Sequence, residues 1–359
     1  MAFRSNVAPT GKEHQVSAIS VIVPARDEEQ NLEPVVRSVA EQEGVGEIIV
    51  VDDQSKDGTH TLLERLRGEI PPLRTVRIES LPRGWTGKNY ALHIGAKRAT
   101  GEWLLFTDAD TRHLPGSLSA MLERAKKENA DLLSLSPGQE VRTWWEKSVI
   151  PLVYVEAAKL YPYEEVSRPD SKEAAANGQY ILIRREIYER VGGHEAIRSE
   201  VLEDVALARR VKACGGRLTF LLGKPWVRTR MYQSFRAMWE GWSKNLYLLY
   251  KKKLGRLLAA VAALWLLDLA PFLGFLFSLL LRTHQGLKGW AAAAACVSIL
   301  AWRHVTYMQA LAQAQFTRRL AIYRLPGVVF YSCLLLNSAR QYLWTERIQW
   351  KGRSYGVRS

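Results

Sequence analysis

Cysteine is scarce in this sequence, which excludes two kinds of cross-linked architecture. The 359 residues include only three cysteines, Cys214, Cys296 and Cys333, and these are widely spaced. A structural zinc site needs clustered cysteines, and a disulfide framework needs several pairs of them. We therefore expect neither, and a reducing compartment is the simpler interpretation.

Acidic residues are nearly absent from the C-terminal part. Residues 205–359 contain 24 basic residues and only three acidic ones, whereas residues 1–204 contain 26 basic and 33 acidic residues. The net charge of +14 therefore arises in the C-terminal part alone. A total this basic could indicate nucleic acid, acidic lipid or a phosphorylated substrate as a partner. Nucleic acid is disfavoured because the basic residues mostly flank or interrupt apolar segments.

Several familiar signatures are missing. The N-terminal residues lack the apolar run of a signal peptide, so we expect the catalytic part to stay on the side of the membrane where it is made. No GxGxxG motif follows the first predicted strand, and no GxxxxGK[ST] motif follows any strand. A dehydrogenase and a P-loop enzyme are therefore disfavoured.

Three apolar segments in the C-terminal part are candidate membrane spans. Residues 257–281 are apolar except for Asp268 and Ser278, and about 20 residues suffice to cross the bilayer core. Two weaker candidates, 289–312 and 320–338, are interrupted by Arg303, His304, Arg324 and Pro326. Each could instead be an amphipathic helix at the interface.

A segment rich in aromatic and basic residues, 231–256, precedes the first candidate span. It is typical of an interfacial helix in the cytoplasmic headgroup zone, because it contains Trp239, Trp242, Tyr247, Tyr250, Lys251, Lys252, Lys253 and Arg256. The positive-inside rule then places the N-terminal part in the cytoplasm. Three crossings would leave the basic tail WKGRSYGVRS outside. Either the third segment does not fully cross, or the number of crossings is even.

Residues 18–136 alternate short β-branched apolar runs with amphipathic stretches of helical length. This alternation predicts βαβ units and a parallel sheet covered on both faces. Ligands of such sheets bind beyond the carboxyl ends of the strands. Those ends read Pro24-Ala-Arg-Asp-Glu28, Asp52-Asp53 and Asp108-Ala-Asp110. Acidic residues therefore converge on one edge.

Carboxylates gathered at one edge repel one another unless a cation lies between them. A divalent cation bound to a polyphosphate meets this need, and Asp108 and Asp110 have the spacing to reach one hard metal. Asp108 and Asp110 could equally be helix N-caps, and Asp53 and Asp57 could be turn and cap residues.

Five motifs in order resemble the family 2 glycosyltransferases of GT-A fold. They lie within residues 18–250 and read SVIVPARDEE, VVDDQSKDGT, GKNYALHIGAKRATGEWLLFTDADT, NGQYILIRREIYERVGGHE and VLEDVALARRVKACGG. GWTGKNYAL and the C-terminal WKGRSY are similar to the membrane-bound hopanoid-associated and carotenoid (diaponeurosporenoate) glycosyltransferases. Ceramide glucosyltransferases are a more distant likeness.

The resemblance implies an α/β protein with a GT-A (Rossmann-like, mostly parallel sheet) catalytic domain and C-terminal transmembrane or interfacial helices. We expect an N-terminal tail at 1–17, the catalytic domain at 18–230, the interfacial helix at 231–256 and a membrane domain at 257–359 with two to three spans. The protein would be integral to the cell (inner) membrane, with its catalytic domain in the cytoplasm.

The resemblance also assigns donor-binding residues. Ala25, Arg26 and Glu28 would hold the nucleotide base and ribose, and Asp53 would pair with the uracil ring. Lys88 would meet the donor diphosphate. A lysine at a helix N-terminus opposes the helix dipole, and a phosphate would remove that conflict.

By the same resemblance, Asp108 and Asp110 would hold Mg²⁺ or Mn²⁺ between the phosphates, with Asp110 as the direct ligand. Asp204 would be the general base, a role compatible with capping its helix. One carboxylate base without a second carboxylate as nucleophile implies single displacement with inversion.

The sugar and acceptor side would be lined by Asn177, Gly178, Gln179, Glu203, Gln233 and Trp239. The QxxRW signature of some relatives is only partly matched, because Arg236 is followed by alanine. Arg236 can still serve the diphosphate, but processive polymerisation is in doubt. His194 is more often structural in such a context. The aromatic stretch from Trp144 is core packing for the most part, or a groove for a lipid.

The combined expectation is a metal-dependent, inverting hexosyltransferase that moves a sugar from a UDP-sugar to a lipid hydroxyl of hopanoid, carotenoid or sphingolipid type. A polysaccharide synthase is one alternative, but about a hundred C-terminal residues are too few for an export channel at about 20 residues per span. A non-catalytic membrane scaffold is another, and the intact Asp108, Asp110 and Asp204 argue against it.

Overall fold

The computed structural model describes residues 19–280, 286–345 and 347–356. The expected tail at 1–17 lies outside this range. The α/β part contains β1 (Ile19–Ala25), α1 (Leu32–Ala40), β2 (Val45–Asp52), α2 (Thr59–Glu69), β3 (Leu73–Arg77), α3 (Gly87–Arg98), β4 (Trp103–Phe106), β5 (Thr111–His113), α4 (Ser117–Lys127), β6 (Leu132–Ser136), β7 (Gly138–Gln139), α5 (Trp144–Leu160), α6 (Tyr163–Ser167), β8 (Ile181–Arg184), α7 (Arg185–Arg190), α8 (Glu203–Ala213), β9 (Leu218–Leu222) and β10 (Val227–Thr229).

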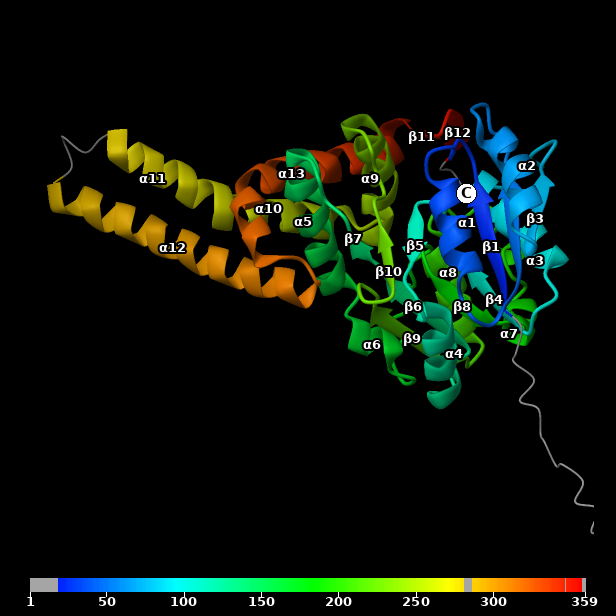
Figure 1. Cartoon of the computed structure of the whole chain (residues 1–359). Coiled ribbons are helices and arrows are strands. Elements are labelled where there is room, and N and C mark those ends of the chain that lie inside the picture. Colours follow the sequence, from blue (N-terminus) through cyan, green and yellow to red (C-terminus); the bar gives the residue numbers. More distant parts are fainter. Residues whose placement is uncertain (1–18, 281–285, 346, 357–359) are drawn as a thin grey trace, which may run out of the picture.

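The seven-stranded sheet at the centre of this part has the order β3-β2-β1-β4-β8-β6-β9 (Figure 1). Its strand pairs are parallel except those of β8, which runs antiparallel to both β4 and β6. Helices cover both faces, since Val21 and Val23 of β1 pack with α1 and α2 while Ile22 packs with α3 and α8. The predicted α/β architecture with a mostly parallel sheet is confirmed.

A smaller sheet of order β5-β10-β7 lies beside the carboxyl end of β4. Strand β5 follows the Asp108-Ala-Asp110 turn directly and pairs antiparallel with β10. The buried Thr107 fixes this turn, because its hydroxyl bonds to Thr111 at 2.9 Å and to the Gln179 carbonyl at 2.8 Å. The acidic turn is therefore held rigidly where β1, β2 and β4 end.

The C-terminal part contains α9 (Phe235–Leu249), α10 (Leu254–Leu264), a π-helical turn (Trp265–Leu269), α11 (Ala270–Leu280), α12 (Gly286–Gln313), a 3-10 turn (Arg318–Tyr323), α13 (Arg324–Arg340), a second π-helical turn (Gln341–Thr345), β11 (Arg347–Trp350) and β12 (Arg353–Gly356). Helices α5, α9 and α13 share one apolar core. In this core Trp242, Tyr247 and Tyr250 are only 4–6% exposed. These aromatic side chains therefore pack inside the protein, not in a headgroup zone as expected, because α13 and α5 cover that face of α9.

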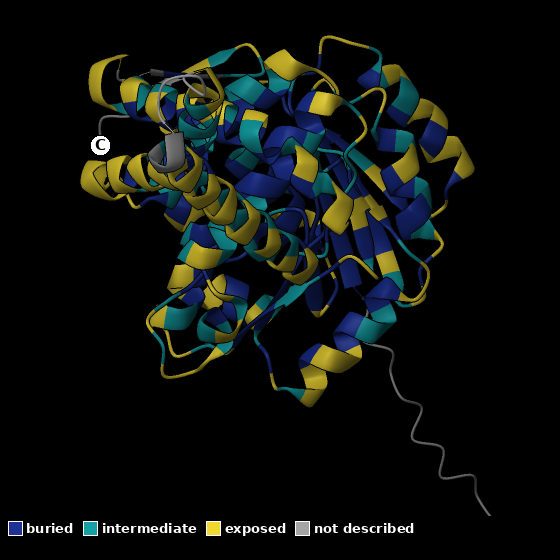
Figure 2. Ribbon diagram, turned by 90° about the vertical axis from the view of Figure 1, so that its left-hand side faces the viewer, coloured by how far each residue is buried: buried dark blue, intermediate teal, exposed yellow. Residues whose placement is uncertain are grey.

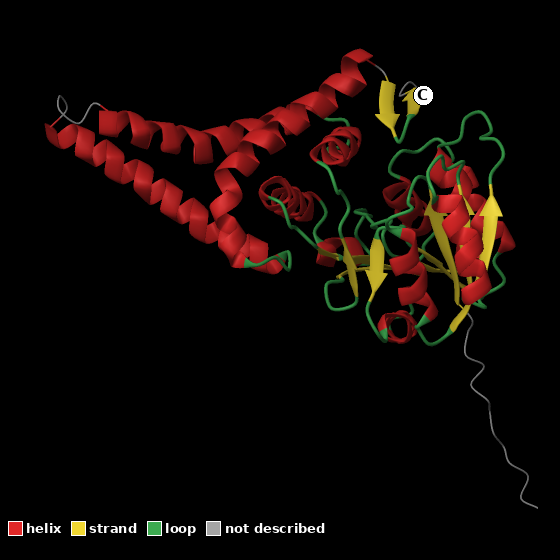
Figure 3. Cartoon of the chain, turned by 45° about the horizontal axis from the view of Figure 1, so that its top comes forward, coloured by secondary structure: helices red, strands yellow, loops and turns green. Residues whose placement is uncertain are grey.

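Two apolar helices in the described part of the chain are long enough to cross a membrane, Leu254–Leu280 and Arg318–Thr345. The first spans α10, the π-helical turn and α11, close to the expected 257–281, although Leu281 lies outside the described residues. The expected span 289–312 falls in α12, which is not one of the two. Helices α11 and α12 lie side by side and project away from the α/β part (Figures 1 and 3). Figure 2 shows them mostly exposed.

The charges that interrupt the apolar segments pair with one another. Asp268, 1% exposed, accepts from Arg303 of α12 at 2.8 Å and from Arg324 of α13 at 2.5 Å. The Arg324 guanidinium also lies 4.4 Å from the centre of the Tyr307 ring. The sequence shows three isolated charges, whereas the fold makes them one ion-pair cluster that joins three helices.

The C-terminal residues WKGRSY form a β-hairpin. Strands β11 and β12 are antiparallel, and the turn between them consists of Lys351 and Gly352, both with positive φ (43° and 72°). Such a two-residue turn matches the twist of the flanking strands. Ile348 is fully buried. The chain end thus returns to the α/β part, as Figures 1 and 3 show.

Candidate active site

A cavity of about 640 Å³ lies at the carboxyl ends of β1, β2 and β4. The predicted site residues, with the exceptions of Arg236 and Trp239, line it: Ala25, Arg26, Glu28, Asp53, Lys88, Asp108, Asp110, Asn177, Gly178, Gln179, Glu203, Asp204 and Gln233. The convergence of strand-end residues therefore occurs as parallel-sheet geometry dictates.

The GWTGKN segment begins α3 and builds one wall of the cavity. Thr86 caps the helix by accepting a hydrogen bond from the Asn89 backbone N–H at 3.3 Å. The buried Asn89 amide ties α3 to the loop before α8 by donating to the carbonyls of Ile197, Arg198 and Glu200. Gly87 leaves room for the Asp53 and Arg353 side chains, because a Cβ there would collide with both.

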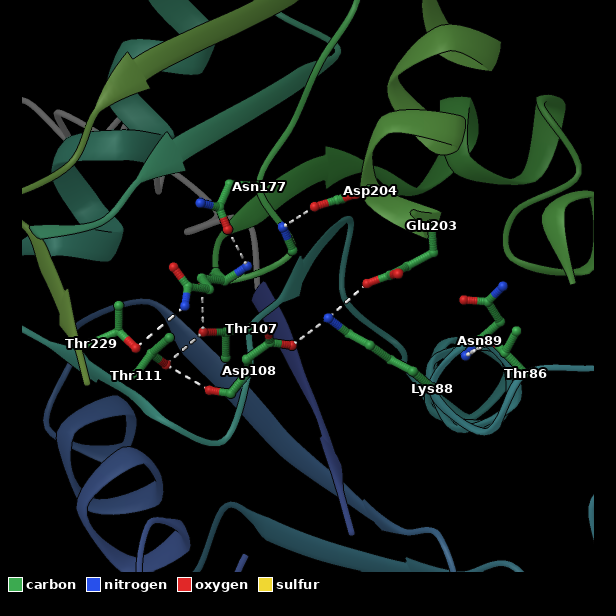
Figure 4. A network of polar contacts seen from close by, with 12 residues as sticks. Thr86, Lys88, Asn89, Thr107, Asp108, Thr111, Asn177, Glu203, Asp204 and Thr229 are labelled. Carbon is green, nitrogen blue, oxygen red and sulfur yellow. Dashed lines mark hydrogen bonds and ion pairs between the residues drawn. The ribbon is translucent and has the colours of Figure 1, made fainter. Parts of the chain in front are cut away.

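Lys88 lies at the centre of the acidic edge. Its Nζ is 2.7 Å from Asp108 Oδ1 and 2.6 Å from Glu203 Oε1, as Figure 4 shows. Burial disfavours the charged amine, but the Asp108 and Glu203 carboxylates outweigh burial and raise the pKa of Lys88 well above its usual value. Burial alone would raise the pKa of Glu203, but the positive charge of Lys88 outweighs burial, so the pKa of Glu203 is lowered. Lys88 is thus a fixed cation held between β4 and α8.

Asp110 fits a divalent cation. Its Oδ1 is buried with no hydrogen-bond partner among the described residues. Burial, followed by the charges of Asp108 and Glu28, raises the pKa of Asp110 to about 8. No group of three or more metal-ligating side chains occurs in the described part of the chain. Asp110 and Asp108 would therefore supply one or two oxygen ligands, with the rest from phosphate and water, the usual arrangement for Mg²⁺.

Asp204 lies in the first turn of α8 with both oxygens bonded to backbone. Oδ1 accepts from the Val205 N–H at 2.7 Å and Oδ2 from the Gly178 N–H at 3.0 Å. Burial and the neighbouring Glu203 charge nevertheless raise the pKa of Asp204 to about 6. The carboxylate is therefore oriented, mostly ionised at neutral pH and basic enough to accept a proton. Asp204 is not the cap of α8, because Leu202 occupies that position and Asp204 lies within the first turn.

The ends of β1 and β2 form another side of the cavity. Arg26 Nη1 donates to the Asp53 carbonyl at 2.7 Å. The carboxylate of Asp53 is held by a bidentate ion pair with Arg353, and that of Glu28 is paired with Lys351. Nearby Asp57 has the turn-and-cap role, because it accepts from the Thr59 and Glu29 backbone N–H groups.

Residues 20–192 match the description Glycosyl transferase family 2. The chain belongs to glycosyltransferase family 2. By the description of this family it is a glycosyltransferase. A 4,4'-diaponeurosporenoate glycosyltransferase of Staphylococcus haemolyticus (strain JCSC1435) is 25% identical to it over 352 residues, which cover 95% of this chain and 89% of the relative.

Two further likenesses cover most of the glycosyltransferase. The 4,4'-diaponeurosporenoate glycosyltransferase of Staphylococcus aureus (strain MRSA252) is 24% identical over 346 residues, 95% of this chain and 88% of the relative. A mannosyltransferase from Pyrobaculum calidifontis, solved in complex with GDP-Man and Mn²⁺, superposes with a TM-score of 0.51 at 18% identity, covering 91% of this chain and 87% of that chain. The latter shows the shared fold.

Two residues of the glycosyltransferase that we assigned to the site do not reach it. The Arg236 side chain is 91% exposed and pairs with Glu240 one turn further along α9. Trp239 packs against Phe235 outside the cavity. Ser234 caps α9 and so sets where the helix begins. With this start, Arg236 and Glu240 lie on the face of the helix that points away from the cavity. On the inward face Lys244 lines the cavity instead, with its Nζ 4.7 Å from the centre of the Trp350 ring.

Other predicted positions have structural partners. Asn177 Oδ1 accepts from the Gln179 N–H at 3.0 Å, and the Gln179 side chain donates to Thr229. Gln233 donates to Asn31 at 2.9 Å. His194 is 1% exposed and bonds to the Tyr188 hydroxyl at 2.9 Å. Burial lowers the pKa of His194 to about 3, so it is a neutral core residue.

The aromatic stretch that forms α5 has two faces in different surroundings. Val149, Ile150 and Leu152 are buried in the core shared with α9 and α13. On another face, Tyr154 and Ala157 line the cavity. Most of the stretch is therefore core, as expected, and one strip of it forms an apolar wall of the site.

Sequence reasoning missed the residues that reach the glycosyltransferase site from the C-terminal hairpin. Trp350 and Lys351 line the cavity, and Arg353 holds Asp53. A signal was present, because IQW-KG-RSY has the two-residue turn of a tight hairpin. Nothing in the sequence indicates that this hairpin docks on strand ends some 300 residues earlier.

Proposed function

We propose that this glycosyltransferase is a membrane-anchored, inverting enzyme that moves a sugar from a UDP-sugar to the hydroxyl of a lipid. One observation carries the proposal: a single cavity contains the acidic donor edge, the oriented carboxylate of Asp204 and an apolar wall from α5. Helix α5 also packs against α13 and α12, so the helix that forms this wall is in direct contact with the apolar helices.

The donor residues act by position and charge. Arg26 and Asp53 hold the nucleoside end, and Lys88 holds positive charge where the diphosphate leaves. Asp110 and Asp108 would hold Mg²⁺ or Mn²⁺, which neutralises charge on the departing nucleotide diphosphate. Lys88 also neutralises Asp108 and Glu203, so the negatively charged donor can enter the edge.

Asp204 acts on the acceptor. Its carboxylate takes the proton of the acceptor hydroxyl as that oxygen bonds to the anomeric carbon and the bond from this carbon to the diphosphate oxygen breaks. Gly178 and Val205 hold the carboxylate in one orientation for this transfer. The neighbouring carboxylates Asp108 and Glu203 are both paired with Lys88, so neither is free to act as a nucleophile, which supports a single displacement with inversion.

A lipid acceptor is supported by the apolar lining and by the relatives, whose names give a carotenoid acid as substrate. The wall includes Val153, Tyr154, Ala157, Tyr161 and Leu249. The return of the C-terminal hairpin to the catalytic side favours an even number of crossings. We take α10–α11 and α12 as the pair because α12 lies beside α11, although length and hydropathy alone select the α13 segment in place of α12. Helix α13 is packed on the protein. We place the catalytic domain in the cytoplasm.

Mass spectrometry of lipids from cells with and without the gene tests this function, because it reads the sugar and the acceptor together. The expected result is a lipid heavier by one hexose that appears only with the protein, and NMR of that product should show an inverted anomeric carbon. A ladder of polymer masses would favour the polysaccharide synthase. Failure of the purified protein to consume any nucleotide sugar would favour the scaffold.

A further inference from the structure

The β11–β12 hairpin places a further basic side chain, Lys351, in the donor cavity. Lys351 Nζ donates to the Arg26 carbonyl at 2.7 Å and pairs with the Glu28 carboxylate. Its charge also acts on the carboxyl of Asp110. Lys351 therefore lies between the nucleoside end of the cavity and the metal end, where a diphosphate must pass.

The backbone conformation of Lys351 indicates that its side chain, and not the turn, accounts for a lysine at this position. Lys351 has a φ of 43°, a conformation that non-glycine residues rarely adopt. Glycine or asparagine would suit the turn better, so the turn alone gives no reason for a lysine. An ammonium group has three donors, and two acceptors meet Lys351 among the described residues. One donor remains for a ligand.

The hairpin is anchored on both sides of this lysine. Arg353 forms its bidentate pair with Asp53 and also donates to Gln54 Oε1 at 2.6 Å. Trp350 lies over the Lys244 ammonium of α9. The turn is thus fixed at the cavity rather than hanging over it.

The charge balance of the cavity requires such a cation. Its described lining has nine carboxylates, Asp27, Glu28, Glu29, Asp53, Asp57, Asp108, Asp110, Glu203 and Asp204, against the four bases Arg26, Lys88, Lys244 and Lys351. A diphosphate adds further negative charge. Lys88 is already shared by two carboxylates, and the exposed Arg236 does not contribute.

We propose that Lys351 binds the diphosphate of the donor and that the C-terminal hairpin thereby contributes to donor binding. The inference rests on the proposed function, because it assumes a nucleotide-diphosphate donor. Arg353 is a positioning residue: it holds the hairpin on Asp53 and thereby sets the place of Lys351.

Calorimetry on the full-length protein in detergent tests this. UDP with Mn²⁺ is the probe, GDP with Mn²⁺ is measured beside it, and uridine is the phosphate-free control. Lys351→Met should weaken UDP binding tenfold or more and leave uridine binding within twofold, whereas Lys351→Arg should retain UDP binding within a fewfold. Lys127→Met, the same change on the exposed face of α4, should change neither.

The outcomes separate the two claims. Unchanged UDP affinity in Lys351→Met, with wild-type binding intact, would overturn the inference and leave the proposed function standing. Equal losses for UDP and uridine would also overturn it, because the hairpin would then only shape the nucleoside end. Binding of neither nucleotide by the wild type would contradict the proposed function itself.

Discussion

Asp204 combines properties that usually exclude each other, since it accepts two backbone hydrogen bonds and yet has a raised pKa. Hydrogen bonds favour the ionised carboxylate, whereas burial and the Glu203 charge favour the protonated one. The balance leaves a base that is oriented and also reactive near neutral pH.

Asp204→Asn should lower the turnover number by about a hundredfold or more, the range of general-base catalysis, because the amide cannot accept the proton. Binding of UDP with Mn²⁺ should stay within a fewfold, since Lys88 and Asp110 remain. Rate and calorimetric measurements on the same preparation check this. Normal turnover would contradict the base assignment and would favour an acceptor that arrives ionised, such as a carboxylate.

The pH profile should reflect the same group. A base works only when deprotonated, and the pKa of Asp204 is about 6. The ratio kcat/KM, which reports the free enzyme, should therefore fall about tenfold per pH unit below 6 and be level just above it. Residual activity of Asp204→Asn should lack this acid limb. A wild-type profile that is level from pH 5 to 7 would contradict the assignment.

At this scale the sequence predicted most of the site. Residues directly after a strand, such as Asp53 and Asp108, are placed by the sheet alone, because every parallel strand ends at the same edge. Residues on a helix also need its phase, and the position of the Ser234 cap was not evident. Arg236 was therefore assigned to the site in error, and Lys244 was overlooked.

At the scale of the elements, ion pairs connect the apolar helices to one another. Asp268, Arg303 and Arg324 come from three separate segments. A lone carboxylate in such surroundings would be unfavourable, but two guanidinium groups satisfy both of its oxygens. The interrupting charges read from the sequence are thus part of the packing.

Asp268→Asn should destabilise the glycosyltransferase by about 3 kcal/mol or more, because it leaves two arginines without their shared partner. Thermal unfolding in detergent measures this as a lowered midpoint. Glu240→Gln is the matched control, since it breaks the exposed pair with Arg236 and should shift stability by less than about 1 kcal/mol. Equal midpoints for the two variants would show that the cluster does not hold the helices together.

At the scale of the whole molecule, the carboxyl end of the first strand and the turn of the last hairpin lie at the same cavity. The apolar helices leave the α/β part at α10 and return to it through α13. If they enter a membrane, the catalytic domain and the hairpin must lie on one side of it.

Labelling of single cysteines tests this arrangement. In a background with Cys214, Cys296 and Cys333 changed to serine, Lys127→Cys reports the catalytic domain and Ser354→Cys the hairpin; both positions are exposed. A membrane-impermeant maleimide should label both from the same face of sealed vesicles. Labelling from opposite faces would rule out an even number of crossings.

Sequence reasoning left this topology open for a physical reason. Hydropathy identifies apolar segments but not their partners, and it cannot tell a span from a helix packed on protein. Trp242 and Tyr247 illustrate the difficulty, because interfacial and buried aromatics have the same sequence pattern. Only the docking of Lys351 and Arg353 on the first two strands fixes where the chain ends.

The position of the hairpin also affects how this protein can be handled. Strand β12 ends at Gly356, three residues before the last residue. An affinity tag or fluorescent protein fused to the carboxyl end would therefore be joined within a few residues of the hairpin whose Arg353 holds Asp53. We expect a fusion that displaces this hairpin to weaken nucleotide binding, and a fusion at the amino end avoids that effect.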